Sequence, residues 1–456
     1  MKHLQLASFL ILLTFAFGAC VTQPSGNSNS GVVQTTPSPA ATASSTEAAG
    51  DTPPVTLPVL DAFFASDSRF AAELKAQVNL TDEQVELLRK VAREETSKLR
   101  ERENGEYSGT TTAARELAEN RIKEIVGEEK ASELAKFVSV RWRGNETAES
   151  GEAKPGSSTA SKEAGLPSTP NSIPTDTRVV VNIPAYRMDV FDNGRLLKSY
   201  KIGIGYPEFP LPTGLREAKA IIFNPPWTPP DEPWVEAPNS KVKVGQKVEA
   251  GSKLNPLGVL KIPIGSPSLI HGGKSPAKLG TFASHGCVGL TDPMAQDFSK
   301  VLAQLAGTKL SDADISGYKR NRSETKQVTL SRPVPVELRY ETIVAEDGKL
   351  HIYRDVYDHN SNTEENLRAV LSAHGVRLED LTEEERAEVM AALMEMSRDA
   401  RGKLDQPSTA SSPSPSPSPA KNKSRRVTRT VKGKKEIVIE IAALKGKGYP
   451  QIAQIK

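Results

Sequence analysis

Three tracts rich in Ser, Thr, Pro, Ala and Gly interrupt this chain of 456 residues and limit how much of it can form a packed core. They lie over residues 21–58, 147–175 and 408–420. Such sequences cannot bury enough apolar surface to offset the conformational entropy lost on folding, so we expect disordered linkers there. The hydrophobic fraction of 37% is below the about 45–50% of compact globular chains. We therefore expect separate folded modules rather than one continuous core.

The hydrophobic patterning changes from one module to the next. Apolar residues recur at helical spacing over residues 60–145, and a Thr-x-x-Gln capping box begins at Thr81, which predicts two to four amphipathic helices. Short strand-like runs with an Asn-Gly hairpin signal follow over residues 176–310, and one helix is expected over 293–305. The pattern predicts a multi-domain protein in which a small α-helical module precedes a mostly-β domain with one packed helix.

The helical module reads as a spacer or a docking module, and its Asn-Leu-Thr-Asp-Glu-Gln stretch is similar to small helical periplasmic chaperones. Strand-like and then helix-like patterns follow the β domain. The predicted division of the chain is a signal peptide over residues 1–20, a disordered tether over 21–58, a helical module over 60–145, a linker over 147–175, a mostly-β domain over 176–310, a β/α extension over 311–400, and a Ser-Pro linker with a basic tail over 401–456.

The first 20 residues have the pattern of an export signal. A basic Lys2 precedes an apolar run over residues 4–17, which is too short to span a bilayer. The small residues before Cys20 resemble the lipobox of bacterial lipoproteins, and this resemblance implies that Cys20 becomes a lipidated N-terminus. We therefore expect an exported lipoprotein, anchored to a membrane through Cys20 and facing the periplasm or the cell wall. An ordinary cleaved signal with an incidental cysteine is the alternative.

The charge of the chain is polarised toward its C-terminal end. Residues 421–456 contain 11 Lys or Arg and two Glu, a net charge of +9, whereas the whole chain has a net charge of +3. Such a basic tail predicts contact with an anionic envelope polymer or a membrane surface, and a solvated end is the alternative. The near-balance of charge overall, together with the export signal, argues against nucleic acid as a partner.

Cys287 is one of only two cysteines, and it follows two histidines closely in sequence. With Cys20 assigned to the signal, a disulfide framework is excluded. His271 and His285 both lie within the 16 residues before Cys287. A thiol needs a nearby base or positive field to ionise at neutral pH, and imidazole provides the base. Gly286 lets the backbone approach a substrate and offer N–H groups to an oxyanion. The residues therefore indicate a Cys/His acyl-transfer centre.

These residues resemble the catalytic domain of the L,D-transpeptidase (YkuD-type) family. The family pattern is a His-Gly followed about a dozen residues later by Ser/Thr-x-Gly-Cys, as in His271-Gly272 and Ser284-His285-Gly286-Cys287. Three upstream segments, residues 211–214, 224–230 and 255–258, also resemble family motifs; they read Leu-Pro-Thr-Gly, Asn-Pro-Pro-Trp-Thr-Pro-Pro and Asn-Pro-Leu-Gly.

The resemblance implies a β-sandwich-like domain that binds peptidoglycan stem peptides. Cys287 would attack the L,D peptide bond to form a thioester, and His271 would be the general base. The acyl group would then pass to an amine acceptor that the sequence does not identify, in cross-linking or remodelling of peptidoglycan. No cofactor and no metal are expected. The further implied site residues are His285 and the backbone at Gly286 and Cys287 for the oxyanion, Ser284 and Gly272 as supports, and Trp227, Asn255 and Gly289 in a substrate cleft.

Gly289 departs from the family pattern, because the residue two places after the cysteine is usually an arginine. Loss of that cation would alter donor preference or slow the reaction. Arg187, Lys261 and Lys274 are candidates to supply it. The departure also leaves a second hypothesis open, a catalytically silent peptidoglycan-binding lipoprotein with the same fold.

Two further interpretations of the histidines and the cysteine need no acyl transfer. Cys287 could be a buried structural thiol with satisfied core histidines beside it. Alternatively, His271, His285 and Cys287 could be three zinc ligands, although no fourth ligand follows at suitable spacing.

Overall fold

The computed structural model describes residues 55–100, 110–142, 169–229, 235, 240–403, 425–426 and 430–450. The predicted signal peptide, with Cys20, and nearly all of the tether lie outside the described residues. Most of the linker over 147–175 and the Ser-Pro repeat also lie outside them. Among the helices that the structure describes, none is both long enough and apolar enough to cross a membrane.

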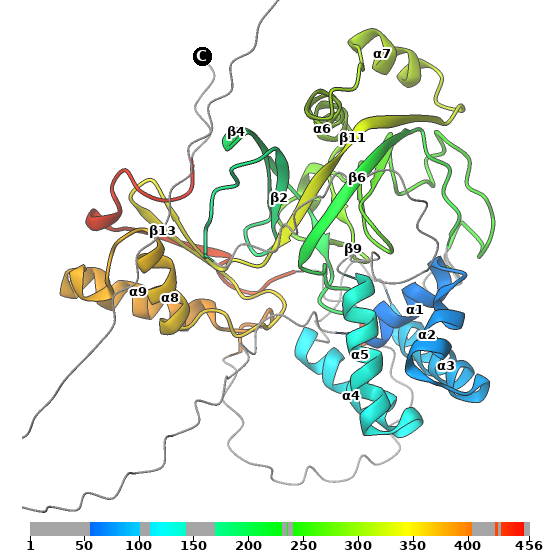
Figure 1. The fold of residues 1–456 in the computed structure, drawn as a ribbon, viewed down its shortest axis with the longest axis horizontal. Helices are drawn as coiled ribbons and strands as arrows, with labels where there is room; N and C mark the ends of the chain where they lie inside the picture. Colours follow the sequence, from blue (N-terminus) through cyan, green and yellow to red (C-terminus); the bar gives the residue numbers. More distant parts are fainter. Residues whose placement is uncertain are drawn as a thin grey trace, which may run out of the picture. The chain divides into compact units, whose positions relative to one another are not determined.

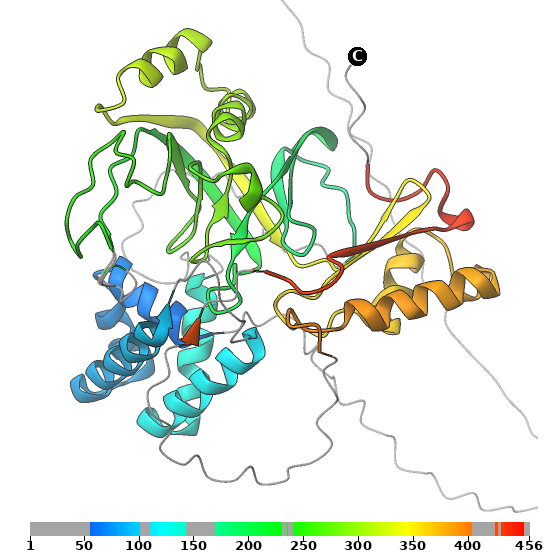
Figure 2. The ribbon, with the colours of Figure 1, turned by 180° about the vertical axis from the view of Figure 1, so that it is seen from behind.

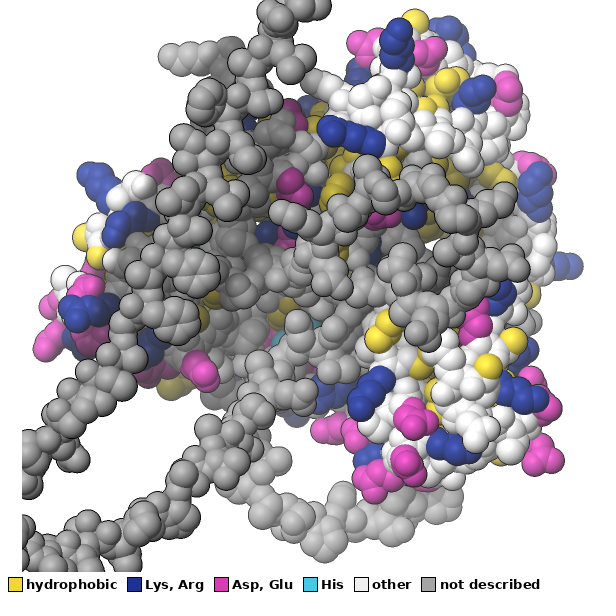
Figure 3. Space-filling model, viewed as in Figure 1, with side chains coloured by type: hydrophobic (Ala, Val, Ile, Leu, Met, Phe, Trp, Pro, Cys, Tyr) yellow, Lys and Arg dark blue, Asp and Glu magenta, His cyan; other side chains and the backbone are white. Residues whose placement is uncertain are grey.

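Five helices with a core of their own form the N-terminal module. Thr81 and Gln84 cap α3 reciprocally, as the capping box predicts. Leu74 and Leu88 are fully buried between the helices, while acidic and basic side chains lie interspersed on their visible face (Figure 3). The first helix begins at Leu57, inside the predicted tether. The helices are α1 (Leu57–Ser66), α2 (Phe70–Val78), α3 (Asp82–Lys98), α4 (Thr111–Val126) and α5 (Glu128–Trp142).

A mixed eight-stranded sheet follows, with the order β10-β8-β7-β6-β11-β2-β3-β4 (Figures 1 and 2). The strands β2, β3 and β4 form consecutive antiparallel pairs. Asn193 and Gly194 join β3 to β4 with positive φ values, as the Asn-Gly signal predicts. The strands are β2 (Arg178–Asn182), β3 (Arg187–Asp192), β4 (Arg195–Lys201), β6 (Gly214–Phe223), β7 (Leu260–Pro263), β8 (Leu269–His271), β10 (Val288–Gly289) and β11 (Lys326–Arg339).

The sheet continues beyond residue 310, the predicted end of the mostly-β domain, because it includes β11. β11 lies inside the sheet, antiparallel to β6 and parallel to β2, and its Val336 and Leu338 are fully buried. Local patterning does not reveal a pairing between strands so far apart in sequence. Helix α6 (Asp292–Leu305) packs on the same core through Phe298 and Leu302. The neighbouring elements are α7 (Asp312–Arg320) and the short parallel pair β5 (Ile204–Gly205) with β9 (Phe282–Ser284).

A three-stranded antiparallel sheet with two helices forms the extension, and it includes part of the predicted tail. Its order is β12-β13-β15. Ile439 and Ile441 are buried in the core that this sheet shares with the helices, so this part of the basic tail is folded, while Glu436, Val438 and Glu440 are exposed. The elements are β12 (Ile343–Glu346), β13 (Lys349–Tyr353), α8 (Glu364–Ala373), α9 (Glu383–Met396) and β15 (Glu436–Glu440), and elsewhere β1 (Leu99–Arg100) pairs with β14 (Arg425–Arg426).

The end of the predicted linker over 147–175 is also part of the folded structure. Asn171 is 1% exposed. Its amide donates to the Ile343 carbonyl at 3.0 Å and accepts from the Ala345 N–H at 2.9 Å. The amide side chain thereby completes the hydrogen bonding of β12, which the Pro- and Ser-rich composition of the linker does not predict.

Candidate active site

His271 belongs to a row of residues that crosses three neighbouring strands. In β8 it pairs with Lys261 of β7 on one side and with Gly289 of β10 on the other. Directly opposed residues of antiparallel strands project from the same face, so His271 and Lys261 share a face. Cys287 lies in the turn between β9 and β10, two residues before Gly289. The register therefore brings the predicted base beside the strand that follows the predicted nucleophile.

Residues 284–287, here called the cysteine turn, are closed by Ser284. Its hydroxyl accepts from the Cys287 N–H at 2.9 Å and donates to the Cys287 carbonyl at 2.6 Å. Gly286 has a φ of +87°, a conformation that favours glycine. The Cys287 N–H, one of the groups expected to bind an oxyanion, donates to the Ser284 hydroxyl in this conformation. Cys287 as a residue is partly exposed, and it forms no disulfide.

His271 is buried, with 3% of its surface exposed. Its Nδ1 lies 2.7 Å from the Gly272 carbonyl oxygen. A carbonyl oxygen only accepts hydrogen bonds, so Nδ1 carries the proton and Nε2 presents a lone pair. Burial, together with the positive charge of Lys274, lowers the pKa of His271 from 6.5 to about 3, against the opposing hydrogen bond to Gly272. The imidazole is therefore a neutral base at physiological pH.

Asp292, in the first turn of α6, fixes the backbone around His271. Its Oδ1 accepts from the Gly273 N–H at 2.8 Å and from the Val259 N–H at 3.1 Å. A Cβ built on Gly272 would lie 2.5 Å from the same oxygen, so the close approach requires glycine. Asp292 cannot be recognised from the sequence, because its place at a helix start predicts a cap and does not indicate its partners.

His285 is held between aromatic side chains. Its ring meets Tyr206 and Phe209 nearly at right angles, with ring centroids 5.2 and 4.6 Å apart. This edge-to-face packing holds the ring of His285, and with it the cysteine turn, against the segment that carries Tyr206 and Phe209. Among the described residues, no group of three or more His, Cys, Asp or Glu side chains is arranged to hold a metal ion.

The loop over residues 205–211, which contributes both aromatic residues, is bonded to the N-terminal helices. The hydroxyl of Thr56, the N-cap of α1, donates to the Glu208 carbonyl at 2.8 Å. The hydroxyl of Thr111, the first residue of α4, donates to the Pro207 carbonyl at 2.8 Å. Both threonines are buried. These contacts cannot be predicted from the sequence, since a threonine at a helix start indicates only a local cap.

The structure gives Trp227 and Asn255 structural contacts. The backbone of Trp227 forms an isolated antiparallel bridge with Val248. The Asn255 side chain donates to the Pro225 carbonyl at 2.7 Å and accepts from the Leu257 N–H at 3.0 Å. These bonds fasten the loop after β6 to the turn before β7, so Asn255 shapes this region through the backbone.

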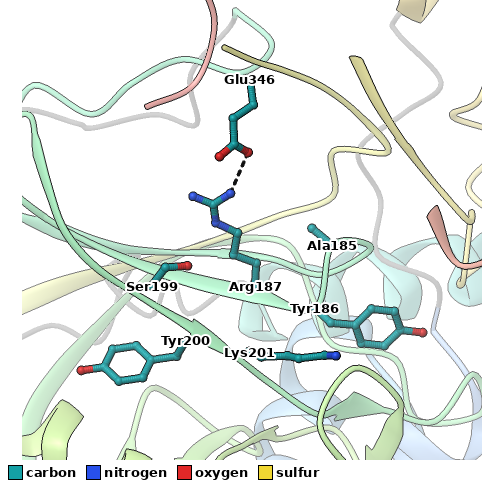
Figure 4. Close-up of a pocket in the computed structure, with 7 residues that line it drawn as sticks. All are labelled: Ala185, Tyr186, Arg187, Ser199, Tyr200, Lys201 and Glu346. Carbon is teal, nitrogen blue, oxygen red and sulfur yellow. Dashed lines mark hydrogen bonds and ion pairs between the residues drawn. The ribbon is translucent and has the colours of Figure 1, made fainter. Parts of the chain in front are cut away.

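Three residues are candidates to replace the arginine that the family usually has at position 289, and one of them, Arg187, lies at a different site from His271 and Cys287. It lines a pocket of about 430 Å³ with Tyr186, Lys201 and four further residues, among them neither His271 nor Cys287. Figure 4 shows its side chain directed at Glu346, to which it is ion-paired at 2.8 Å. It also pairs with Asp189 at 2.8 Å. Lys261 and Lys274 instead interact electrostatically with Cys287 and His271, respectively.

Residues 176–315 match the family model described as the L,D-transpeptidase catalytic domain. Among solved structures, an L,D-transpeptidase from Mycobacterium smegmatis is 17% identical, with a TM-score of 0.22, over 36% of this chain and 58% of that one. The NMR structure of the catalytic domain from an Enterococcus faecium L,D-transpeptidase is 15% identical, with a TM-score of 0.23, over 37% of this chain and all of that one. The chain thus spans less than two thirds of the first protein. A search among curated proteins found no match.

Proposed function

Because residues 176–315 form a domain of the L,D-transpeptidase catalytic family, we propose that this protein is a cell-envelope L,D-transpeptidase with Cys287 as nucleophile and His271 as general base. The observation that carries the proposal is the register that pairs His271 with Gly289, two residues after Cys287. The burial of His271 and the partial exposure of Cys287 support the same roles. The substrate class is a peptidoglycan stem peptide that contains an L,D bond.

In the proposed reaction, the thiol proton of Cys287 passes to Nε2 of His271, and the thiolate attacks the carbonyl carbon of the L,D bond. The nitrogen of that bond leaves with the proton held by His271, which releases a terminal D-amino acid. The acyl group remains on Sγ as a thioester. An acceptor amine then attacks the thioester, loses a proton to His271, and forms the new amide as the sulfur leaves. That proton returns to the sulfur and restores the starting state.

The location of the protein is a second part of the proposal. The apolar run over residues 4–17 and the small residues before Cys20 support export and lipidation at Cys20. The low-complexity sequence that follows would allow the enzyme to reach the cell wall from a membrane. Exposed lysines near the C-terminal strand support contact with an anionic envelope polymer; they are Lys432, Lys434, Lys445 and Lys447.

A silent peptidoglycan-binding protein is the second candidate function. Two observations favour it: Gly289 stands where the family usually has arginine, and the Cys287 N–H donates to Ser284. This hypothesis predicts binding of stem peptides without thioester formation.

Intact-mass measurement after incubation with a carbapenem distinguishes the two functions. The enzyme should gain one acyl adduct at Cys287, and Cys287→Ala should gain none. His271→Ala should slow adduct formation by about 10²–10⁴-fold, the usual contribution of a general base. Cys20→Ala is the matched control, because it removes the other cysteine and should leave the adduct intact. If no adduct forms and Cys287 reacts no faster than free cysteine, the silent binder is correct.

A further inference from the structure

Position 289 needs a glycine because a neighbouring side chain takes the space there, and not because of its backbone conformation. Its φ is not among the positive values found at other described glycines, so its conformation is open to any residue. Its N–H and carbonyl both bond to Gly203 at 2.9 Å, in an isolated antiparallel bridge. A Cβ built on Gly289 would lie 2.8 Å from Cγ and 2.9 Å from Cε of Lys274. The stem of Lys274 therefore fills the space that any side chain at this position would need.

Lys274 crosses β10 from one side to the other. Its backbone N–H donates to the Leu290 carbonyl at 3.0 Å, just beyond the end of β8. Its stem passes over Gly289, and its Nζ donates to the Ala283 carbonyl at 2.8 Å. Ala283 lies in β9 and directly precedes the cysteine turn. Lys274 thus links the end of β8 to the strand from which the cysteine turn begins.

The charged groups around His271 come from four elements. Burial lowers the pKa of the imidazole, and the positive charge of Lys274 lowers it further. Lys261 of β7 lies directly opposite His271 in the strand register, and it interacts electrostatically with Cys287 of the cysteine turn. Asp292 of α6 brings a carboxylate whose Oδ1 is engaged by two backbone N–H groups. His271 therefore stands between a lysine on each side.

We propose that Gly289 and Lys274 are a matched pair, in which the glycine admits the lysine across β10 and the lysine positions the cysteine turn while keeping a positive charge beside the reacting groups. Lys274, in the loop after β8, then supplies the positive charge that the family usually has at position 289. Lys274 is a positioning residue, since it acts through the Ala283 carbonyl and through its charge.

In the proposed pair, the charge of Lys274 acts on Cys287 in addition to that of Lys261, which interacts electrostatically with this cysteine. A cation near a thiol favours the thiolate, and the thiolate is the nucleophile. Each unit by which the pKa of a thiol falls is equivalent to a tenfold change in its ionisation constant. A positive charge also attracts an anionic reagent over a neutral reagent of the same size. The ratio of the two reaction rates therefore reports the charge near the sulfur separately from the general accessibility of the thiol.

The test is alkylation of Cys287 in the full-length protein with neutral iodoacetamide and with anionic iodoacetate, each followed by mass measurement of the peptide that contains Cys287. Rates are measured across a pH series. The variants are Lys274→Met, which keeps most of the stem without charge or donor, Lys274→Arg, Gly289→Ala, and the double variant Lys274→Met with Gly289→Ala. Lys278→Met, a lysine substitution in the same loop, is the matched control. Thermal unfolding of each variant shows whether it folds.

Lys274→Met should lower the iodoacetamide rate at neutral pH by about tenfold, move the pH profile toward higher pH, and lower the iodoacetate-to-iodoacetamide ratio several-fold. Gly289→Ala should do the same by displacing the lysine, and the double variant should lose no more than either single variant. Lys274→Arg should keep the ratio, and Lys278→Met should change nothing. If Lys274→Met does not fold, Gly289→Ala and Lys274→Arg provide the comparison.

The pair is refuted if Lys274→Met keeps the wild-type ratio and profile, or if the losses in the two single variants multiply in the double variant. The catalytic meaning of the pair rests on the proposed transpeptidase function. Alkylation, however, requires no stem peptide and no carbapenem. If the iodoacetate-to-iodoacetamide ratio depends on Lys274 but no acyl adduct forms, the matched pair is supported and the transpeptidase function is rejected. Failure of the one proposal can thus be told from failure of the other.

Discussion

The hydroxyl of Tyr357 donates to the Gly205 carbonyl at 2.8 Å and accepts from the Leu211 N–H at 3.3 Å, so one fully buried phenol bridges both ends of the loop beside the cysteine turn. A Cβ built on Gly205 would lie 3.2 Å from the N and Cα atoms of Gly286, which places this end of the loop directly against that turn. Tyr357 comes from the extension, after β13. A segment outside the residues matched by the family model therefore helps to shape the candidate active site.

Tyr357→Phe should destabilise the protein and slow the reaction of Cys287. The substitution keeps the ring but leaves the Gly205 carbonyl and the Leu211 N–H without their buried partner, at a cost of about 1–3 kcal/mol. Thermal unfolding gives the stability, and the rate of alkylation of Cys287 gives the effect on the site. Tyr318→Phe is a suitable control, because Tyr318 is only partly buried and belongs to α7. Equal effects of the two substitutions would contradict a specific role for Tyr357.

Asp292→Ala and Asp292→Asn should differ clearly. Alanine removes the oxygen that accepts from the exposed Gly273 N–H and the partly buried Val259 N–H, and about 0.5–1.5 kcal/mol of stability should be lost for each hydrogen bond. Asparagine retains an oxygen at that place and should lose much less. Chemical denaturation of the two variants measures the difference. If asparagine is as damaging as alanine, the charge of Asp292 matters more than its two hydrogen bonds.

The elements with strong local signals could be predicted from the sequence. The helix over 293–305 agrees with α6 within one residue, because Thr291 and Pro293 mark its start and its apolar face is regular. The hairpin at Asn193-Gly194 is confirmed for the same reason, since the turn residues themselves require positive φ. The mostly-β character of the domain and the helical module before it are confirmed as well.

Long-range pairings could not be predicted. Nothing near β11 indicates that it joins β2 and β6, and nothing near Ile439 indicates that a basic segment completes the sheet of the extension. At the site, His271 and Cys287 could be named because the chemistry restricts their residue types. Tyr357 and Asp292 could not, because their roles depend on backbone atoms that only the folded chain brings within reach.

His271 should make the stability of the protein fall in acid. Its pKa is about 3 in the folded state and near 6.5 when it is exposed, so between these values the unfolded state binds more protons. The contribution of His271 to the free energy of unfolding is therefore fully present above about pH 6.5 and declines as the pH falls toward 3. His271→Gln removes this term. As the pH is lowered from about 7.5 to 5, the wild type should lose this contribution and His271→Gln should not, so the unfolding temperature of the variant should rise relative to that of wild type. A difference that stays constant with pH would show that the imidazole is not held neutral.

Removal of the hydroxyls of Thr56 and Thr111 should release the loop over residues 205–211. Valine keeps the shape of threonine but cannot donate to the Glu208 and Pro207 carbonyls, so both would lose a buried hydrogen bond. Amide hydrogen exchange should rise in this loop in the double variant Thr56→Val with Thr111→Val, and alkylation of Cys287 should slow because Tyr206 and Phe209 no longer hold His285 in place.

Thr81→Val provides the control for this experiment, since Thr81 caps α3 in the same helical module. It should destabilise the helices by about 0.5–2 kcal/mol without changing exchange in the loop. If Thr81→Val and the double variant have the same effect on the loop and on Cys287, the helices stabilise the site only through general stability. If the double variant alone acts, the threonine hydroxyls are the physical link between the helical module and the nucleophile, and a partner that moves these helices would alter the reactivity of Cys287.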